Sequence, residues 1–291
     1  MIPAVFKYAS ASTIQEAIEL LQQPDAKVLA GGHSLLPLMK LRLASPPVLV
    51  DINRIDGLDY IREDAQLRRL RIGALVRHVQ MERSPLIRAS YPLLYDAAQG
   101  IGDPQVRNRG TLAGSIAHAD PASDWPAALL AYDGEVVASG PRGERVLRAR
   151  EFYVDILTTT LEPDELVTEV RFPMPPPGTG GAYEKLERKV GDYAVVGVAA
   201  LVTIDGERIT SAGIGLCNAA SVTIKASSAE DFLSGNVAAP DNVNEAARLA
   251  MDASDPIEDD RGPVEYKRAM VRELTRRALR RALERARGVQ A

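Results

Sequence analysis

The sequence predicts a mixed α+β protein with two domains, a larger one at residues 1–175 and a smaller one at residues 176–291. At about 150 residues per domain, a chain of this length has room for two. The first part alternates helix and strand patterns around a double glycine. The segment at 173–181, PMPPPGTGG, has the composition of a linker. Beyond it, two long strand patterns are followed by helical ones, which is typical of a separate α+β domain.

The first predicted helix follows an S-x-x-Q capping-box pattern at Ser12 and Gln15. Apolar residues at helical spacing form one stripe from Ile14 to Leu21, and Pro24 ends the helix. The pattern then predicts a strand, a glycine turn, a short helix and a second strand, at 27–30, 31–32, 35–43 and 48–52.

The remaining patterns are assigned in the same way. Up to the linker we expect strands at 67–72, 135–138 and 166–172, and helices at 92–99 and 125–132. Asp124 is the expected N-cap of the helix at 125–132. After the linker we expect strands at 193–204 and 209–216, and helices at 229–233, 241–251 and 265–287.

Composition excludes several functional classes. The 35 basic and 39 acidic residues give a net charge of −4, which argues against a dedicated nucleic-acid binder. The single Cys217 excludes an iron–sulfur cluster or a cysteine zinc site on this chain. The three histidines have no metal-binding spacing, so we expect no metal site. There is no signal-peptide pattern and no long apolar run, so we expect a cytoplasmic protein without a transmembrane segment.

The segment Ala30-Gly31-Gly32-His33-Ser34 is the first candidate site. A strand ends there, two glycines follow and a helical turn begins. Glycine lets backbone N–H groups approach a ligand closely, and such a turn is suited to a phosphate. The dinucleotide, P-loop and nucleophile-elbow patterns are all absent. The alternative is a tight turn that binds nothing.

Three other segments have both a functional and a structural interpretation. Arg109–Ser115 is rich in small residues and hydroxyls, and Asp124 behind it suits sugar hydroxyls or simply caps a helix. Lys185–Ala194 is a basic stretch that could also be a solvated strand edge. The arginine-rich C-terminal helix has an inward stripe at Met270, Leu274, Ala278, Leu279 and Leu283, which favours a solvated outer face over a partner contact.

Three stretches together resemble the flavoprotein (medium) subunits of molybdenum hydroxylases, the family of carbon monoxide dehydrogenase and xanthine dehydrogenase. They are AGGHSLLPLMKLRLASPPVLVDINRI at 30–55, IGDPQVRNRGTLAGSIAHADPASDWPAALLA at 101–131 and KLERKVGDYA at 185–194. The resemblance covers essentially the whole chain. It implies a two-subdomain FAD-binding fold of the vanillyl-alcohol-oxidase-like (PCMH) type at 1–175. It also implies a small C-terminal domain with a three-stranded sheet and helices at 176–291.

The resemblance also implies which residues bind FAD. The diphosphate would lie against the first loop and be completed by the second, the adenosine ribose would lie at Asp124, and the isoalloxazine ring would lie beside the third segment. The implied residues are Ala30, Gly31, Gly32, His33, Ser34, Leu35, Leu36, Ile101, Thr111, Ala113, Gly114, Ser115, Asp124, Lys185, Asp192 and Tyr193. No catalytic residue is implied. The family reads T-x-G-G where this chain has Ala113, which would cost about 1 kcal/mol if that position required a positive φ.

By this resemblance, the chain is the electron-transfer flavin subunit of a heterotrimeric-type oxidoreductase. Its partners would be a small subunit with [2Fe-2S] clusters and a large subunit with the molybdenum cofactor, and any membrane association would be peripheral, through the complex. The substrate could be carbon monoxide, a purine, an N-heterocycle or an aldehyde. Two alternatives remain open: a stand-alone flavin oxidase or reductase, and a non-redox assembly protein that has lost FAD.

Overall fold

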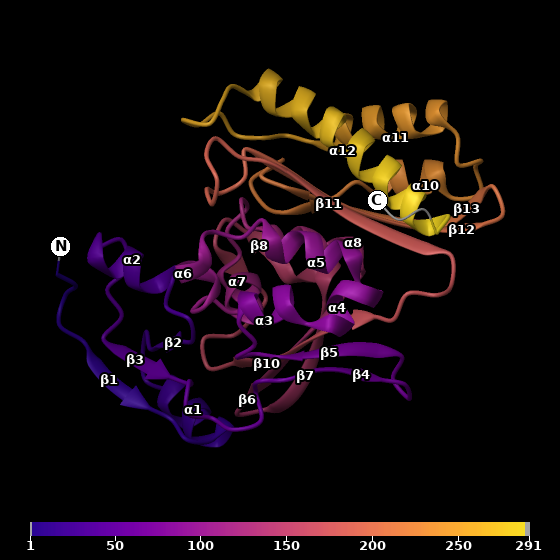
Figure 1. The fold of residues 1–291 in the computed structure, drawn as a ribbon. Helices are drawn as coiled ribbons and strands as arrows, with labels where there is room; N and C mark the ends of the chain where they lie inside the picture. Colours follow the sequence, from indigo (N-terminus) through magenta and orange to yellow (C-terminus); the bar gives the residue numbers. More distant parts are fainter. Residues whose placement is uncertain (1, 289–291) are drawn as a thin grey trace.

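The computed structural model describes residues 2–288, and Figure 1 shows their arrangement. The strands are β1 Lys7–Ser10, β2 Lys27–Leu29, β3 Val48–Asp51, β4 Ile61–Asp64, β5 Arg69–Gly73, β6 Glu135–Gly140, β7 Gly143–Arg148, β8 Tyr153–Asp155, β9 Thr158–Thr159, β10 Leu166–Pro173, β11 Thr179–Leu186, β12 Val196–Asp205, β13 Arg208–Cys217 and β14 Ile224–Lys225. The helices are α1 Ile14–Leu21, α2 Leu35–Lys40, α3 His78–Arg83, α4 Pro85–Ser90, α5 Pro92–Gln99, α6 Pro104–Arg107, α7 Leu112–His118, α8 Asp124–Ala131, α9 Ala149–Phe152, α10 Ser227–Leu233, α11 Pro240–Ala253 and α12 Val264–Ala286.

The N-terminal subdomain is a small parallel sheet in the order β1-β3-β2, flanked by α1 and α2. The capping box predicted at Ser12 and Gln15 is wrong by one residue. Thr13 is the N-cap, and its hydroxyl accepts from the Glu16 amide at 3.1 Å. The Glu16 carboxylate in turn accepts from the Ser12 amide at 2.7 Å. A carboxylate is favoured in the first turn because the helix N-terminus carries a partial positive charge.

The second subdomain contains the antiparallel sheet β4-β5-β10-β6-β7, with α3 to α8 on one side of it (Figure 1). Every residue of α8 is buried. A helix that is apolar on all sides is surrounded by protein rather than lying at a surface. In this protein α8 lies between the core of its own subdomain and strands β12 and β13 of the C-terminal domain.

The C-terminal domain is an antiparallel sheet in the order β11-β12-β13-β14. It has the three long strands that were expected, and the two-residue β14 extends it. Helices α10, α11 and α12 cover the outer face, while α5 and α8 contact the inner face, so the sheet lies between helices of both domains (Figure 1). The mixed α+β fold class is therefore confirmed.

The contact between α8 and β13 is a close approach of two backbones. A Cβ on Gly215 would lie 2.0 Å from the carbonyl oxygen of Ala127, and one on Gly213 would lie 1.9 Å from that of Ala131. We expect Gly215→Ala to lower the free energy of unfolding by about 1–3 kcal/mol, because neither backbone can yield without separating the domains. Chemical denaturation measures this. Gly206→Ala is the control: its Cβ would lie in open space in the β12–β13 turn, but φ there is 58°, so it should lose about 1 kcal/mol through backbone strain alone. A Gly215→Ala loss no larger than that of the control would contradict the explanation.

Two arginines on α12 hold the domains together. Arg281 and Arg285 both pair with Asp96 of α5, the second at 2.6 Å, and the Tyr183 amide also donates to Asp96 at 3.2 Å. The predicted inward stripe of this helix is confirmed, since Leu274, Ala278, Leu279 and Leu283 are buried and Met270 packs partly buried against them. The prediction of a purely solvated outer face is wrong for the two arginines that reach Asp96.

Two predictions near the domain boundary also differ from the structure. The linker predicted at 173–181 is shorter, since β10 extends through Pro173 and β11 already begins at Thr179. The glycines at 180–181 lie in β11 between packed helices: a Cβ on Gly180 would lie 2.1 Å from the Ala282 carbonyl oxygen of α12, and one on Gly181 would lie 3.0 Å from Leu93 Cβ of α5. The short helix predicted at 35–43 ends at Lys40, and Arg42 adopts a left-handed conformation with φ of 61°. The sequence patterns did not predict strands β1, β4, β7, β8, β9, β11 and β14, and the strand predicted at 193–204 begins at Val196.

Candidate functional site

A large cavity lies where the two subdomains and the C-terminal domain meet. Its volume is about 990 Å³, at the upper end of the range for small-molecule sites. It is lined by the loop after β2, the turn before α6, the start of α7, the segment 157–167 and the segment 185–193. The predicted site residues that line it are Ala30, Gly31, Gly32, His33, Ser34, Leu35, Ile101, Thr111, Ala113, Gly114, Ser115, Asp124, Lys185, Asp192 and Tyr193. Leu36 is not among its lining residues.

The loop Gly31–Ser34 presents backbone N–H groups without backbone acceptors. None of these four amides donates to a backbone carbonyl within residues 2–288. Their carbonyls are turned the other way, since Gly32 and Ser34 accept from the Leu36 and Leu38 amides at 3.0 and 3.2 Å. Backbone N–H groups require a partner, and a run of free amides in a concave loop is an anion site. The His33 side chain lies to one side, 3.3 Å from the Gln105 carbonyl.

The second small-residue loop begins helix α7. Thr111 is the N-cap, and its hydroxyl accepts from the Gly114 amide at 3.1 Å. Ala113 lies in the first turn of the helix and is absent from the residues with positive φ. The backbone strain that a positive φ would impose on an alanine at position 113 is therefore absent. Ser115 lies two residues further along α7 and lines the cavity.

The two loops touch through their backbones. A Cβ on Gly31 would lie 2.3 Å from the Arg109 carbonyl oxygen and 2.7 Å from the Gly110 Cα. Gly110 is itself backed by His78, whose Nδ1 accepts from the Trp125 indole at 3.0 Å. Burial, with His33 and Arg77 nearby, lowers the pKa of His78 to about 3, so the ring is neutral and can accept. The loops therefore form one continuous wall, and only glycine fits at position 31.

Asp124 and Lys185 form a buried ion pair at the cavity wall. Lys185 Nζ lies 3.2 Å from Asp124 Oδ2, and the Tyr183 hydroxyl donates to Asp124 Oδ1 at 2.6 Å. Both charged side chains are less than a tenth exposed. Burial raises the pKa of Asp124, and Lys185 and Tyr183 oppose that rise. Two predictions are wrong. Asp124 is the first residue of α8, and the N-cap is Ser123. The Lys185 side chain is buried in an ion pair and does not lie on a solvated strand edge.

The turn Gly100–Gly102 is held by two cationic side chains. Lys185 donates to the Gly100 carbonyl at 2.8 Å, and Arg107 donates to the Ile101 and Gly102 carbonyls at 3.0 Å each. Arg107 also pairs with Glu82 at 2.9 Å. These contacts set the position of Ile101 at the cavity wall. Sequence reasoning missed Arg107, since a single arginine in a four-residue helix has no distinguishing pattern.

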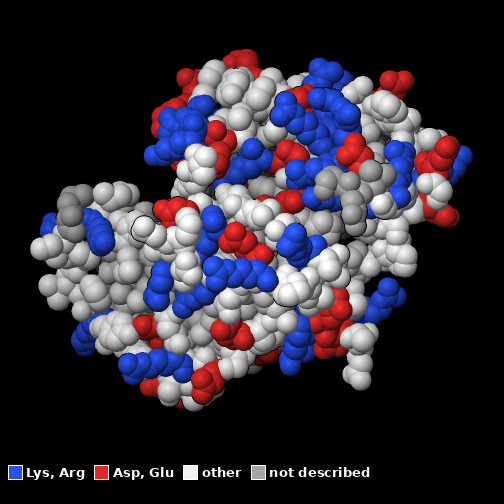
Figure 2. All heavy atoms as spheres, viewed as in Figure 1, with Lys and Arg blue, Asp and Glu red and all other residues white. Residues whose placement is uncertain are grey.

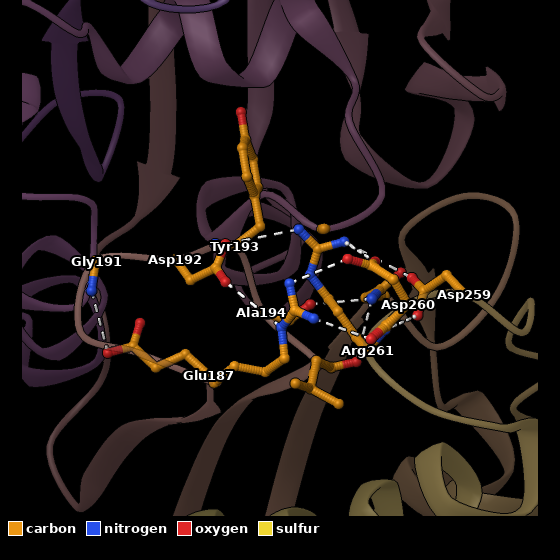
Figure 3. A network of polar contacts seen from close by, with 12 residues as sticks. Glu187, Gly191, Asp192, Tyr193, Ala194, Asp259, Asp260 and Arg261 are labelled. Atoms are coloured by element: carbon orange, nitrogen blue, oxygen red, sulfur yellow. Dashed lines mark hydrogen bonds and ion pairs between the residues drawn. The ribbon is translucent and has the colours of Figure 1, made fainter.

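Tyr193 points away from a network of ion pairs that holds its loop (Figure 3). Asp192 lies 3.6 Å from Arg261 and 3.8 Å from Arg188, and it accepts from the Tyr193 amide at 2.8 Å. Partial burial opposes ionisation of Asp192, but these donors outweigh it and lower its pKa. Tyr193 is 42% exposed and lines the cavity, and removal of water from its hydroxyl raises its pKa.

Three further observations concern the surface charge, membrane-spanning helices and metal sites. On the face shown in Figure 2, basic and acidic side chains are interspersed over both domains. Within residues 2–288 no helix is long and apolar enough to cross a bilayer. In the same range no group of three or more His, Cys, Asp or Glu side chains is placed to hold a metal ion.

Comparison with known proteins identifies the family. Residues 4–175 match the FAD binding domain in molybdopterin dehydrogenase, and residues 181–282 match the CO dehydrogenase flavoprotein C-terminal domain. The carbon monoxide dehydrogenase medium chain of Hydrogenophaga pseudoflava is 43% identical over 96% of this chain and 97% of its own. Subunit alpha of the 6-hydroxypseudooxynicotine dehydrogenase complex of Paenarthrobacter nicotinovorans is 39% identical over 99% of this chain and 97% of its own.

Solved structures agree with the sequence matches. A chain of carbon monoxide dehydrogenase from Hydrogenophaga pseudoflava superposes with a TM-score of 0.95 at 44% identity, over 98% of this chain and 99% of that one. Quinoline 2-oxidoreductase from Pseudomonas putida 86 superposes with a TM-score of 0.90 at 32% identity, over the full length of both chains. The cavity, its free amides and these matches lead to one conclusion: this chain belongs to the FAD-binding medium-subunit family of molybdenum hydroxylases, and is a flavoprotein subunit of an oxidoreductase.

Proposed function

We propose that this chain is the electron-transfer subunit of a molybdenum hydroxylase complex. Its FAD would accept electrons from [2Fe-2S] clusters on a small partner subunit and pass them to an external acceptor, while a large partner carries the molybdenum cofactor. The main observation that supports this division is that the chain has a single cysteine. Its large cavity, by contrast, has the size and the loops that suit a nucleotide cofactor. Clusters need about four thiolates, so they must lie on another chain. FAD would supply the change from one-electron transfer by the clusters to two-electron transfer to the acceptor.

The residues present fit FAD. The free amides of the loop Gly31–Ser34, together with Thr111 and Ser115 at the start of α7, form a polar wall suited to the diphosphate. Ile101 and Tyr193 form a less polar part of the cavity, which suits the isoalloxazine ring. The ribose contact of Asp124 stays a prediction, since its carboxylate lines the cavity but is already bonded to Tyr183 and Lys185.

We propose that this chain does not select the substrate. Relatives that match 96% or more of this chain are named for carbon monoxide, 6-hydroxypseudooxynicotine, nicotine, glyceraldehyde and caffeine. One subunit type therefore accompanies chemically unrelated substrates. This favours a role limited to binding FAD and presenting it to its electron donor and acceptor.

The test is purification under a native tag, followed by a visible spectrum and mass analysis of the released ligand. We expect FAD at about one per chain, and copurification of an iron–sulfur protein and a molybdenum-containing chain. The isolated chain should not reduce its own flavin with organic donors. A solitary chain that does so would support a stand-alone oxidase instead. A chain that shows no saturable FAD binding would support the non-redox alternative.

A further inference from the structure

Two residues outside the cavity connect the two loops that would hold the diphosphate. Asn53 follows β3 in the N-terminal subdomain, and Arg77 precedes α3 in the second subdomain. Neither lines the cavity, and neither belongs to the residues that the sequence predicted for the site. Each is bonded to a backbone carbonyl of one of the loops and also to the other residue.

The contacts form a chain from one loop to the other. Asn53 Nδ2 donates to the Ala30 carbonyl at 2.9 Å. The Asn53 side-chain oxygen accepts from one terminal nitrogen of Arg77, and the other terminal nitrogen of Arg77 donates to the Arg109 carbonyl. The Arg109 carbonyl is also the atom that limits position 31 to glycine. The two subdomains are thus linked at the point where their loops meet.

The surroundings restrict the Asn53 side chain and the Arg77 backbone to these positions. The Asp51 carboxylate accepts from the Asn53 amide at 2.8 Å and from Asn53 Nδ2 at 2.6 Å, and the Tyr8 hydroxyl donates to its other oxygen at 2.6 Å. Burial of Asp51 opposes ionisation, but these donors outweigh it and lower its pKa. The Arg77 amide donates to the Gln80 side chain at 2.6 Å. Asn53 and Arg77 are therefore held before any ligand arrives.

The bonded Ala30 carbonyl determines where the Gly31 N–H group points. In a trans peptide the C=O of one residue and the N–H of the next point in opposite directions. Because the Ala30 carbonyl is bonded to Asn53, the Gly31 N–H points away from Asn53, and it has no backbone acceptor within residues 2–288. A carbonyl oxygen facing a diphosphate would repel it. Because the Ala30 carbonyl is bonded to Asn53 and the Arg109 carbonyl to Arg77, neither oxygen faces the diphosphate, and this repulsion is avoided.

We propose that Asn53 and Arg77 are positioning residues that preorganise the diphosphate site without touching the cofactor. This rests on the proposed placement of the diphosphate at the loop Gly31–Ser34. Each residue acts through one backbone carbonyl, and the bond between them aligns the loop of one subdomain with the loop of the other.

The test measures FAD affinity of the full-length apoprotein by flavin fluorescence, with the stability of the apoprotein measured separately by denaturation. We expect Asn53→Ala and Arg77→Met each to weaken FAD binding by about 10- to 100-fold, the size of effect seen when residues that orient metal ligands are removed. The double variant should lose less than the product of the two single effects, since the residues act as one unit. Arg77→Lys keeps the charge but loses the planar fork, and should resemble Arg77→Met.

Matched controls separate positioning from general stability. Asn236→Ala removes an asparagine that also bonds a backbone carbonyl, Phe232, at 2.6 Å, and Arg208→Lys alters an arginine that bonds the Gly235 carbonyl at 2.8 Å. Both lie in the C-terminal domain, and neither should change FAD affinity. The proposal is overturned if Asn53→Ala and Arg77→Met reduce stability as the controls do but leave FAD affinity within twofold. It is also overturned if Arg77→Lys binds like the wild type. A wild-type chain that binds no FAD would instead refute the proposed site.

Discussion

Gly31→Ala is expected to weaken FAD binding by about 10- to 100-fold. The added Cβ would lie 2.3 Å from the Arg109 carbonyl oxygen and 2.7 Å from the Gly110 Cα, and both atoms belong to backbone. Overpacking against atoms that cannot change rotamer costs about 1–3 kcal/mol, and each 1.4 kcal/mol is tenfold in affinity. The two loops would have to move apart. The loop Gly31–Ser34 and the start of α7 would then no longer face the same ligand. Titration of the apoprotein with FAD measures the effect.

The matched control for this variant is Gly143→Ala. Gly143 lies on the β6–β7 hairpin of the same domain, has φ of 99°, and its Cβ would meet nothing within 4 Å. This substitution should reduce stability by about 1 kcal/mol through backbone strain alone and leave FAD affinity unchanged. If Gly31→Ala bound FAD like the wild type, the contact between the two loops would have no part in cofactor binding, and our assignment of the cradle would be wrong.

Lys185→Met is expected to lower the free energy of unfolding by about 3–5 kcal/mol at pH 7. The substitution leaves the buried Asp124 carboxylate without its cation, and breaking a buried ion pair from one side costs about this much. Burial already raises the pKa of Asp124, and loss of Lys185 should raise it further. The folded state would then bind a proton at a higher pH than the unfolded state, whose aspartate titrates near pH 4. Stability of the variant should therefore recover as the pH falls from 7 toward 4.

Two comparisons make this result specific. Lys189→Met changes an exposed lysine four residues away and should alter stability by no more than about 0.5 kcal/mol. The double variant Lys185→Met with Asp124→Asn should be more stable than Lys185→Met alone, since no uncompensated charge remains. Equal stability of the single and double variants across this pH range would show that Asp124 and Lys185 do not act as a pair.

Local sequence patterns predicted most of the long elements. The helix at Pro92–Gln99 has the bounds that were predicted, and β3, β10, β13 and α12 differ by one or two residues. These elements carry apolar periodicity or capping signals that act within a few residues. Short strands such as β1 and β7 were missed because they form by pairing with distant partners and have little pattern of their own.

The residues of the candidate site likewise fall into two groups, those that local sequence patterns identify and those that they do not. The loop at residues 30–34 and the start of α7 could be identified from small residues after a strand and before a helix, and the structure brings both to one cavity. Asn53, Arg77 and Arg107 could not be identified, because each acts on a carbonyl or side chain of another segment. The Asn53–Arg77 bond spans 24 residues, and the Asp124–Lys185 pair spans 61.

The sequence by itself therefore determined most of the long elements, the family resemblance and the residue types of the cradle, since turns, helix starts and small residues are local properties. Only the tertiary structure decided what Asp124 and Lys185 do. A carboxylate at the start of a helix and a lysine in a basic stretch are ordinary surface features until α8 is buried beneath the C-terminal sheet. Burial then makes each charge depend on the other, because an unpaired charge in that environment is strongly disfavoured.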